Sequence, residues 1–431
     1  MSFAFDLDPE PGARAANATA AVAARRRRRA ALIGVVSALT VLVLAAAGYV
    51  GLVATHPLPA ADAAVHAGAV QTIQTAAVAP AWPAQGSAAV GLVGQKQLLG
   101  RHGSDAPVPI ASMTKTITAL VLLDRHPLTV GQQGPTITFG QRDVDILTQV
   151  WNEDGSWAPV QAGERLSLTQ AMTAMLLPSA NNYARSLAVW SSGSQQAFVT
   201  AANKWLAQNG FTHTHMTDPS GLDAGSVSNL TDLVGIGELA ISNPVLEKIV
   251  DTKKTTLPVV GELHNTNALL GTDGIEGVKT GFTAEAGHCL LFAATVTAGG
   301  AKRTLVGAML GQPEYTDLWR DVPKLLASYE QGFHQLDLTD AGKTVYATYR
   351  TAWGSTTTLV AATQPTLELY SKGSVTVTVA ADSLSTAADR ARAGTVTFSD
   401  GTRKVVADLT TTGAIAPPGL WWKLTHPAEI L

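Results

Sequence analysis

The sequence is poor in cysteine and in charged residues. Cys289 is the one cysteine, so no disulfide can form within the chain and no site with several cysteine ligands is available. We interpret Cys289 as a small buried hydrophobe. Charged residues make up 15% of the chain against 46% hydrophobic residues, which favours a folded protein over a disordered one. The formal net charge of -3 gives no indication of a nucleic-acid partner.

Spacings typical of metal ligands are also missing. The chain contains no H-E-x-x-H pattern, and His213 and His215 alternate as they would along a strand. The sequence therefore predicts neither a metal site nor a cofactor.

A long hydrophobic run is present near the N-terminus. Arginines occupy positions 25–29, and residues 30–54 are apolar and uncharged. As a helix this run would measure about 37 Å, enough to cross a hydrocarbon core of about 30 Å. It predicts an uncleaved signal-anchor with residues 1–29 in the cytoplasm and the rest of the chain outside the membrane. The alternative is a cleaved signal peptide, whose apolar region is usually shorter, about 7 to 15 residues. Because the arginines adjoin this span, a membrane explains them better than nucleic acid does.

The composition changes along the chain and indicates the domains. Residues 1–24 are polar and alanine-rich, and we expect a disordered tail. Residues 55–85, rich in alanine and proline, are expected to form an extended linker. In residues 86–335 strands flank a helical middle, which predicts an α+β domain. Residues 336–431 carry short β runs and predict a small all-β domain, most simply a sandwich.

Several elements of the α+β domain are predicted individually. Strands are expected at 88–93 and 97–100, and a central, buried helix runs from Ser112 to about Arg125. Residues 127–163 carry mixed turn and short-strand signals. Further helices are expected at 166–177, 182–190, 194–208, 231–241 and 318–332, and antiparallel strands at 274–283, 289–297 and 304–310. In the final domain, Trp421 and Trp422 are expected to pack in the core more readily than to form a membrane-touching or protein-binding edge.

Three short motifs, each occurring once in the chain, carry the chemistry. They are Ser112-Met113-Thr114-Lys115, Ser179-Ala180-Asn181 and Lys279-Thr280-Gly281, in that order. Ser112 and Lys115 are three residues apart and share one helix face, so the lysine can serve as base to a serine nucleophile. The first helical turn also offers free N–H groups to developing negative charge.

The lysine can act as a base only when its pKa is lowered. Burial does this, and so does a second cation, for which Lys279 is placed. Ser179 can relay a proton to the leaving group, and Asn181 can orient Lys115 and the substrate backbone.

The third motif is suited to substrate recognition. Lys279 and Thr280 can bind a terminal carboxylate, and the absence of a side chain at Gly281 admits an extended peptide.

With these motifs in place, the sequence resembles the penicillin-recognising serine enzymes, and among them the low-molecular-weight D-alanyl-D-alanine carboxypeptidases. The likeness is strongest in IASMTKTITALVLLD, DPSGLD and DGIEGVKTGFTAEAGHCLL, and it covers about residues 86–335. It implies a β-lactamase/DD-peptidase-like fold and removal of the terminal D-alanine from peptidoglycan stem peptides. It also implies acylation by β-lactam antibiotics, and an oxyanion hole formed by the backbone N–H groups of Ser112 and Phe282.

The chain departs from the family pattern at a few positions. Ala180 replaces a usual glycine, Asn182 a common aspartate and Ser220 a frequent histidine. None of these changes removes a reactive group of the three motifs. Arg303 either helps to hold the substrate carboxylate or faces solvent.

Two other functions remain open. A β-lactamase would need a general base, typically a glutamate after the second motif, and none occurs between Asn181 and Glu238. A non-catalytic protein that binds the cell wall through the same pocket is the alternative from another class. The sequence also leaves open a preference for carboxypeptidase or endopeptidase activity.

Overall fold

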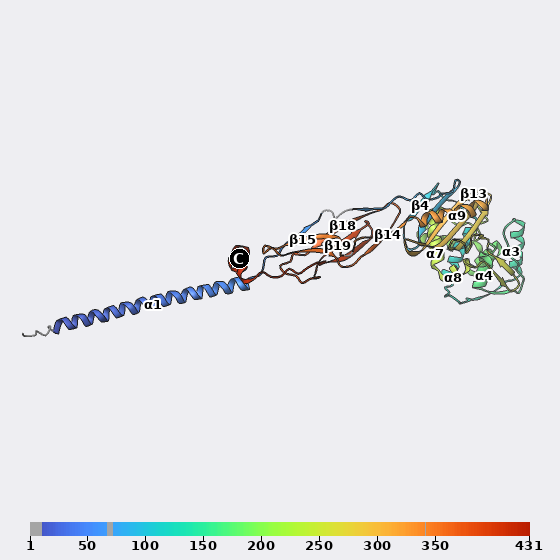
Figure 1. The fold of residues 1–431 in the computed structure, drawn as a ribbon. Coiled ribbons are helices and arrows are strands. Elements are labelled where there is room, and N and C mark those ends of the chain that lie inside the picture. The colour runs from blue at the N-terminus through green and yellow to red at the C-terminus, as the bar shows by residue number, and fades with distance from the viewer. Residues whose placement is uncertain (1–10, 67–71, 341) are drawn as a thin grey trace, which may run out of the picture. The chain divides into compact units, whose positions relative to one another are not determined.

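The computed structural model describes residues 11–66, 72–340 and 342–431, with side chains from residue 20 onward (Figure 1). The chain divides into two units. The large unit comprises Gln74–Leu336 and Thr366–Ser374. The small unit comprises Asp337–Pro365, Val375–Leu431 and the described residues of Met1–Ile73.

A five-stranded antiparallel sheet forms the centre of the large unit. The strand order is β11-β12-β13-β3-β4. The three strands predicted between residues 274 and 310 are confirmed, as are the two predicted before Ser112. The bounds are β3 Ser87–Leu92, β4 Leu98–His102, β11 Ile275–Thr283, β12 Gly287–Ala298 and β13 Ala301–Gln312.

The two faces of this sheet belong to two cores. Leu291 and Ala293 lie in the larger core with the helices of the middle region. Leu290 and Phe292, their neighbours on β12, lie in a smaller core with helix α9 (Tyr315–Glu330). This alternation is the period of two of a strand, and it confirms that the sheet is covered on both sides.

The chain between β4 and β11 is mostly helical. Residues 114–123 of α2 are all buried, which confirms the predicted central helix. The bounds are η2 Ala111–Met113, α2 Thr114–Arg125, α3 Gln141–Asn152, α4 Leu168–Leu176, α5 Asn181–Ser192, α6 Gln195–Gln208, α7 Leu230–Ser242 and α8 Pro244–Val250. Three short ladders join this region: β5 Val108–Pro109 with β8 Val227–Ser228, β6 Thr136–Thr138 with β7 Arg165–Ser167, and β9 Lys254–Leu257 with β10 Gly261–His264.

Over residues 127–163, strand β6 and the turns confirm the predicted mixed signals, whereas helix α3 was not predicted. Its buried hydrophobic side chains are Ile146 and Val150, a stripe too narrow to stand out in the sequence. The helix begins where the Asp143 carboxylate accepts a hydrogen bond from the Gly140 N–H at 2.8 Å. A glycine at this position gives a weaker helix-start signal than serine, aspartate or asparagine.

The small unit confirms the predicted all-β domain, and its strands belong to one connected seven-stranded sheet. The order is β1-β15-β16-β20-β19-β18-β2. The bounds are β1 Ala63–Val65, β2 Ile73–Gln74, β15 Val345–Arg350, β16 Thr356–Ala361, β18 Ser374–Ala381, β19 Arg392–Ser399 and β20 Lys404–Thr411.

Two segments belong to other parts of the fold than the sequence composition predicted. The expected linker at 55–85 contributes β1 and β2, which pair at the two edges of the seven-stranded sheet. Strand β17 (Thr366–Tyr370) pairs with β14 (Phe333–Asp337), so a segment expected in the final domain joins the large unit. Backbone pairing of short edge strands leaves little trace in composition.

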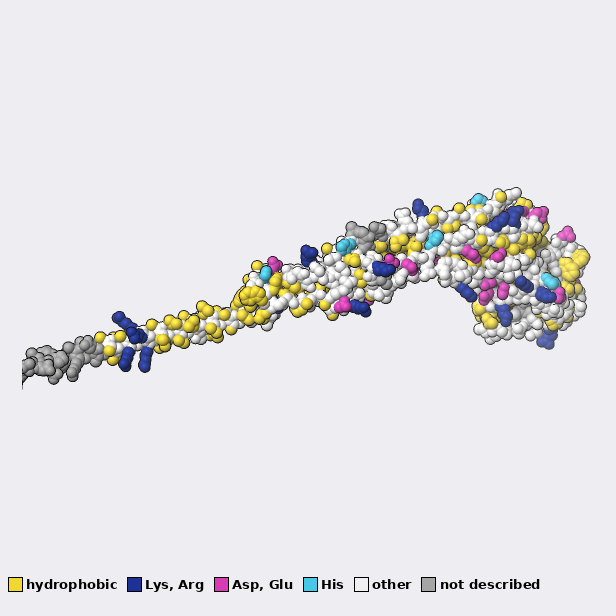
Figure 2. All heavy atoms as spheres, in the orientation of Figure 1, with side chains coloured by type: hydrophobic (Ala, Val, Ile, Leu, Met, Phe, Trp, Pro, Cys, Tyr) yellow, Lys and Arg dark blue, Asp and Glu magenta, His cyan; other side chains and the backbone are white. Residues whose placement is uncertain are grey.

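The N-terminal helix α1 runs over Pro11–Thr55. Its Ala20–Thr55 part is long and apolar enough to cross a membrane, and Figure 2 shows hydrophobic side chains along it beyond the arginines. The expected disordered tail is therefore wrong from Pro11 onward, because alanine has the highest helix propensity. Residues 1–10 of that tail lie outside the described part.

Candidate active site

The three motifs line one cavity of about 280 Å³ in the large unit. Ser112 comes from η2, Ser179 and Asn181 from the junction of α4 and α5, and Thr280 to Phe282 from β11. Lys115 and Lys279 are 0% and 2% exposed and lie beneath these residues. The other residues lining the cavity are Asp154, Gly155, Ser156, Gly221, Leu222, Thr266, Thr283 and Tyr315.

The Lys115 ammonium is enclosed by oxygen atoms. Its Nζ lies 2.8 Å from Ser112 Oγ, 2.5 Å from Asn181 Oδ1 and 2.8 Å from the Ser220 carbonyl oxygen. Ser112 itself lies in the 3-10 turn η2 that precedes α2, rather than in the first α-helical turn as expected. The pair predicted from the S-x-x-K spacing is in direct contact.

The surroundings of Lys115 lower its pKa well below the usual value for lysine. Burial is the largest cause, and the positive charge of Lys279 comes next. Asp218 acts in the opposite direction and Arg185 adds a small lowering. Neutral Lys115 can accept the proton of Ser112.

The junction of α4 and α5 places Ser179 and Asn181. Ser179 has a positive φ of 66° and is 6% exposed. This rare backbone conformation turns the chain sharply after Pro178, and such strain concentrates at functional sites. The Asn181 N–H donates to the Ser156 carbonyl at 2.7 Å, which ties the second motif to the loop at 154–156.

Asn182, at a position where the resemblance implied an aspartate, is a structural residue here. It is 1% exposed, its Oδ1 accepts from the Ala158 N–H at 3.1 Å, and its Nδ2 donates to the Ala158 carbonyl at 2.9 Å. An amide can make both bonds, whereas a carboxylate can only accept.

The Lys279 ammonium lies among hydroxyl and carbonyl oxygens. Its Nζ donates to the Thr280 carbonyl at 3.1 Å and to the hydroxyls of Thr266 and Thr280 at 3.4 Å. Burial lowers the pKa of Lys279 to about 7. The two threonine hydroxyls are 2.6 Å apart and line the cavity, with the Lys279 ammonium in contact with both of them beneath the wall.

Gly281 brings β11 close to Ser112. A Cβ at this position would lie 3.0 Å from the Ile110 carbonyl oxygen and 3.3 Å from the Ser112 nitrogen. The missing side chain therefore permits the strand to pack against η2. This is a second explanation for glycine at position 281, beside the predicted admission of a peptide. Phe282, the next residue, is 53% exposed at the cavity.

The turn at 218–223 supports the first motif, a role that the sequence argument did not assign. A Cβ on Gly221, whose φ is +77°, would lie 1.9 Å from the Ala111 carbonyl oxygen. The Asp218 carboxylate accepts from the Gly221 N–H at 2.9 Å and from the Ser220 N–H at 3.0 Å, and it also bonds the Ser220 hydroxyl. The sequence DPSGLD at 218–223 could have indicated this role, but in the sequence analysis it served only as part of the family resemblance.

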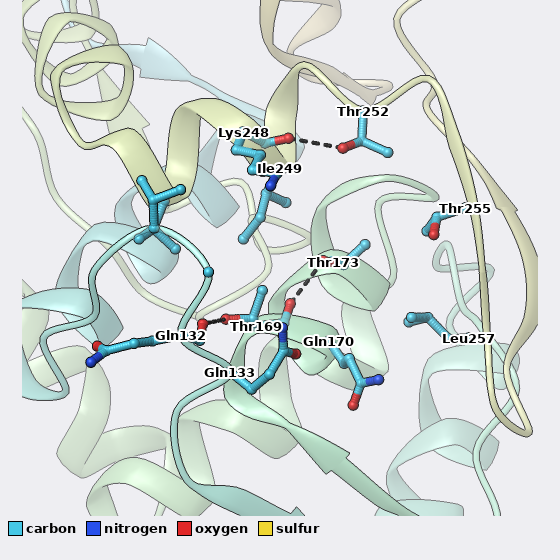
Figure 3. Close-up of a pocket in the computed structure, with 13 residues that line it drawn as sticks. Gln132, Gln133, Thr169, Gln170, Thr173, Lys248, Ile249, Thr252, Thr255 and Leu257 are labelled. Carbon is cyan, nitrogen blue, oxygen red and sulfur yellow. Dashed lines mark hydrogen bonds between the residues drawn. The ribbon is translucent and has the colours of Figure 1, made fainter.

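A second cavity, of about 300 Å³, lies elsewhere in the large unit (Figure 3). Lys248 is the charged residue among those that line it, and none of the predicted site residues does. The hydroxyls of Thr169, Thr173 and Thr252 donate to backbone carbonyls at 2.8 to 3.0 Å. Hydroxyls used in this way are less available to a ligand, so the cavity at Ser112 is the candidate site.

The remaining candidates have structural roles. Arg303 pairs with Glu368 and donates to the Ala298 carbonyl at 3.0 Å, so neither predicted role for it holds. Cys289 is fully buried, which confirms its prediction, and burial raises the pKa of its thiol to about 11. Among the described residues, no three His, Cys, Asp or Glu side chains are grouped so that they could hold a metal ion.

Solved structures share this architecture. A variant of the DD-transpeptidase from Streptomyces is 26% identical and superposes with a TM-score of 0.51, over 59% of this chain and 98% of that one. Penicillin binding protein 5 from Haemophilus influenzae has the same fold at 22% identity and a TM-score of 0.56, over 78% and 98% of the two chains. The fold and the site define a serine hydrolase of the DD-peptidase class.

Sequence relatives narrow this class. The D-alanyl-D-alanine endopeptidase of Pseudomonas aeruginosa is 30% identical over 245 residues, which are 55% of this chain and 76% of that protein. The D-alanyl-D-alanine carboxypeptidase DacA of Escherichia coli is 27% identical over 258 residues, 57% and 61% of the two chains. Residues 75–310 match the D-alanyl-D-alanine carboxypeptidase family of peptidases, and the chain belongs to that family.

Proposed function

We propose that the protein is a serine-type carboxypeptidase that removes the terminal D-alanine from peptidoglycan stem peptides ending in D-Ala-D-Ala. The observation that carries this proposal is the contact between Ser112 Oγ and the buried Lys115 Nζ at 2.8 Å. Family membership supports the substrate class, and the motif chemistry supports an acyl-enzyme.

In the first step, Lys115 takes the hydroxyl proton of Ser112 as Oγ attacks the carbonyl carbon of the penultimate D-alanine. The bond from this carbon to the nitrogen of the last residue then breaks. Ser179 relays the proton to the departing amine, and D-alanine leaves. Water subsequently hydrolyses the ester on Ser112 and regenerates the hydroxyl.

Recognition of the substrate falls to β11. Lys279 and Thr280 bind the terminal carboxylate, and Asn181 holds Lys115 in line with the substrate backbone. The backbone N–H groups of Ser112 and Phe282 stabilise the oxyanion. Each such donor typically contributes about 10²- to 10³-fold in rate.

The same reaction explains binding of penicillin. A β-lactam presents a strained amide and a carboxylate to the same groups, so Ser112 opens the ring and keeps the product as an ester.

The cell wall outside the cytoplasmic membrane is the proposed place of action. Residues 30–54 span the membrane, residues 1–29 lie in the cytoplasm, and residues 86–335, which hold the three motifs, lie outside. The arginines at 25–29 support this orientation through the positive-inside rule.

A D-alanine release assay tests the proposal directly. The full chain is incubated with a soluble pentapeptide ending in D-Ala-D-Ala, and the Ser112→Ala variant serves as the control. Release by the natural chain alone supports the carboxypeptidase. Penicillin labelling without release favours the non-catalytic cell-wall-binding protein, and rapid turnover of penicillin favours a β-lactamase.

Endopeptidase activity is tested separately, since relatives with that name occur. A cross-linked stem-peptide dimer replaces the pentapeptide. Faster cleavage of the dimer than of the pentapeptide would contradict the carboxypeptidase preference.

A further inference from the structure

The short C-terminal helix α10 (Leu420–Thr425) packs beside the end of α1 within the small unit. The Tyr49 hydroxyl donates to the Leu424 carbonyl at 2.9 Å, and Lys423 Nζ donates to the Ala54 carbonyl at 3.1 Å. The carbonyl groups in the last turn of a helix lack partners within it, and a cation is favourable there. Lys423 therefore caps α1, and these two bonds hold α10 beside the last turns of α1, from Tyr49 to Ala54.

Two of the three exposed side chains of α10, Leu420 and Trp421, are apolar, and the third is Thr425 at its last position. Trp421 is 78% exposed and Leu420 is 49% exposed, so the expected core position of Trp421 is wrong. Trp422, by contrast, stacks on His426 at 4.6 Å and meets the edge of Trp353 at 5.9 Å. One tryptophan thus fixes the helix, while the other is presented outward beside the exposed apolar surface of α1.

The position of α10 relative to the bilayer follows from the length of the apolar run. Counted from residue 30, about 20 residues cross a hydrocarbon core of about 30 Å, which brings the chain close to Tyr49. Tyr49 and Ala54, the residues that hold α10, therefore lie at the far boundary of the bilayer. Tryptophan and tyrosine are enriched at this level because one part of each ring system is apolar and the other polar.

We propose that α10 lies in the outer membrane–water interface, with Trp421 and Leu420 inserted among the lipid headgroups and upper acyl chains. The partner is the lipid surface itself. This inference rests on the proposed spanning of the membrane by residues 30–54. It gives the small unit a second membrane contact, far from α1 in sequence, that restricts how α1 tilts.

The test uses the full chain in lipid nanodiscs with an environment-sensitive nitrobenzoxadiazole label on single introduced cysteines. Cys289 is fully buried and does not compete for the label under native conditions. The variants are Trp421→Cys for α10, Leu39→Cys for the middle of the apolar run, and Trp151→Cys as the matched control. Trp151 is a 59% exposed tryptophan on α3. Labelling of Ser112 by fluorescent penicillin confirms that each variant is folded.

We expect the label at position 421 to shift its emission to shorter wavelength and to be quenched by lipids carrying a nitroxide near the headgroup. At position 39 the label should be quenched most by a nitroxide deep in the acyl chain, and at position 151 by neither. A lipid signal at 39 with an aqueous signal at 421 overturns the interfacial helix and leaves the membrane span intact. Aqueous signals at both position 39 and position 421 overturn the membrane span as well as the interfacial helix.

Discussion

The two lysines of the cavity differ in what surrounds their ammonium groups. Lys115 contacts Ser112, Asn181 and Ser220, and burial together with Lys279 lowers its pKa. Lys279 lies among threonine hydroxyls, and burial alone brings its pKa to about 7. The pKa of Lys115 is lowered well below its usual value by burial and by Lys279, whereas Lys279, with a pKa of about 7, can still carry charge near neutral pH.

The pH dependence of acylation follows from Lys115. Raising the pH through its lowered pKa deprotonates the base, so labelling of Ser112 by fluorescent penicillin should become faster and then level off. Lys115→Arg keeps a permanent charge, so at pH values where Lys115 is neutral it should slow acylation by about 10²- to 10⁴-fold, and the rise of the rate with pH should be lost. Lys248→Arg, outside the cavity, is the control. A Lys115→Arg variant that retains the natural rate would remove the base assignment.

Lys279 should discriminate between substrates with and without a carboxylate. Lys279→Ala is expected to lower kcat/KM for a carboxylate-bearing peptide more than for the corresponding neutral ester. In the natural protein this preference should weaken above a pH of about 7, because Lys279 loses its charge there. Equal losses on the two substrates would contradict its role in recognition.

The amide of Asn182 should be needed for stability. Asn182→Asp loses the donor to the Ala158 carbonyl and buries a charge, which should cost about 1 to 3 kcal/mol of unfolding free energy. Thermal denaturation measures this cost, with Asn152→Asp at an exposed position of α3 as the control. Similar changes in Tm for both variants would show that the bond from Asn182 Nδ2 to the Ala158 carbonyl is unimportant.

At the scale of elements, the surroundings of Ser112 and Lys115 depend on a turn that contributes none of the motif side chains. The turn at 218–223 supplies the Ser220 carbonyl to Lys115, and Thr118 Oγ1 donates to the Pro219 carbonyl at 2.7 Å. Gly221 lies against Ala111, whose own φ is 47°. Helix α2, η2 and this turn therefore form one packed unit.

A pair of glycine variants tests this packing. Gly221→Ala and Gly210→Ala both place a side chain at positive φ, a cost of about 1 to 2 kcal/mol. A Cβ at Gly210 meets nothing within 4 Å, whereas one at Gly221 overlaps Ala111. We expect Gly210→Ala to keep normal penicillin labelling and Gly221→Ala to lose most of it. Normal labelling of Gly221→Ala would show that the turn at 218–223 can shift to accommodate the side chain without displacing Ser112.

For the whole molecule, the described chain before the large unit is part of the fold and not only a connection. Strand β1 pairs with β15, with Ala63 opposite Tyr349, and so completes one edge of the small unit's sheet. In the large unit, Trp82 meets the edge of Tyr329 at 5.9 Å.

Truncation should expose this role. Two chains without α1 are compared by calorimetry, one beginning at residue 56 and one at residue 72, so that they differ in β1. The shorter chain should show a lower Tm for the small unit, while the penicillin-stabilised transition of the large unit stays unchanged. If the calorimetric unfolding curves of the two chains coincide, β1 does not stabilise the small unit and acts only as a linker.

Much of this protein follows from the sequence because it depends on local pattern. The buried helix after Ser112, the three strands up to Leu310, the apolar N-terminal run and the three motifs are each read within short windows. The motifs also predicted which side chains line one cavity, since their chemistry requires them to meet.

Tertiary structure alone decided the rest, because those features depend on contacts between segments far apart in the chain. Composition does not show that β1 and β2 pair at sheet edges, that β17 returns to the large unit, or that the Ser220 carbonyl completes the surroundings of Lys115. Trp421 is the same case: hydrophobicity predicted a core position, but packing of α10 on α1 leaves its side chain exposed. Sequence thus determined the candidate reacting groups, and long-range packing determined their surroundings, because burial and partner distance are properties of the fold.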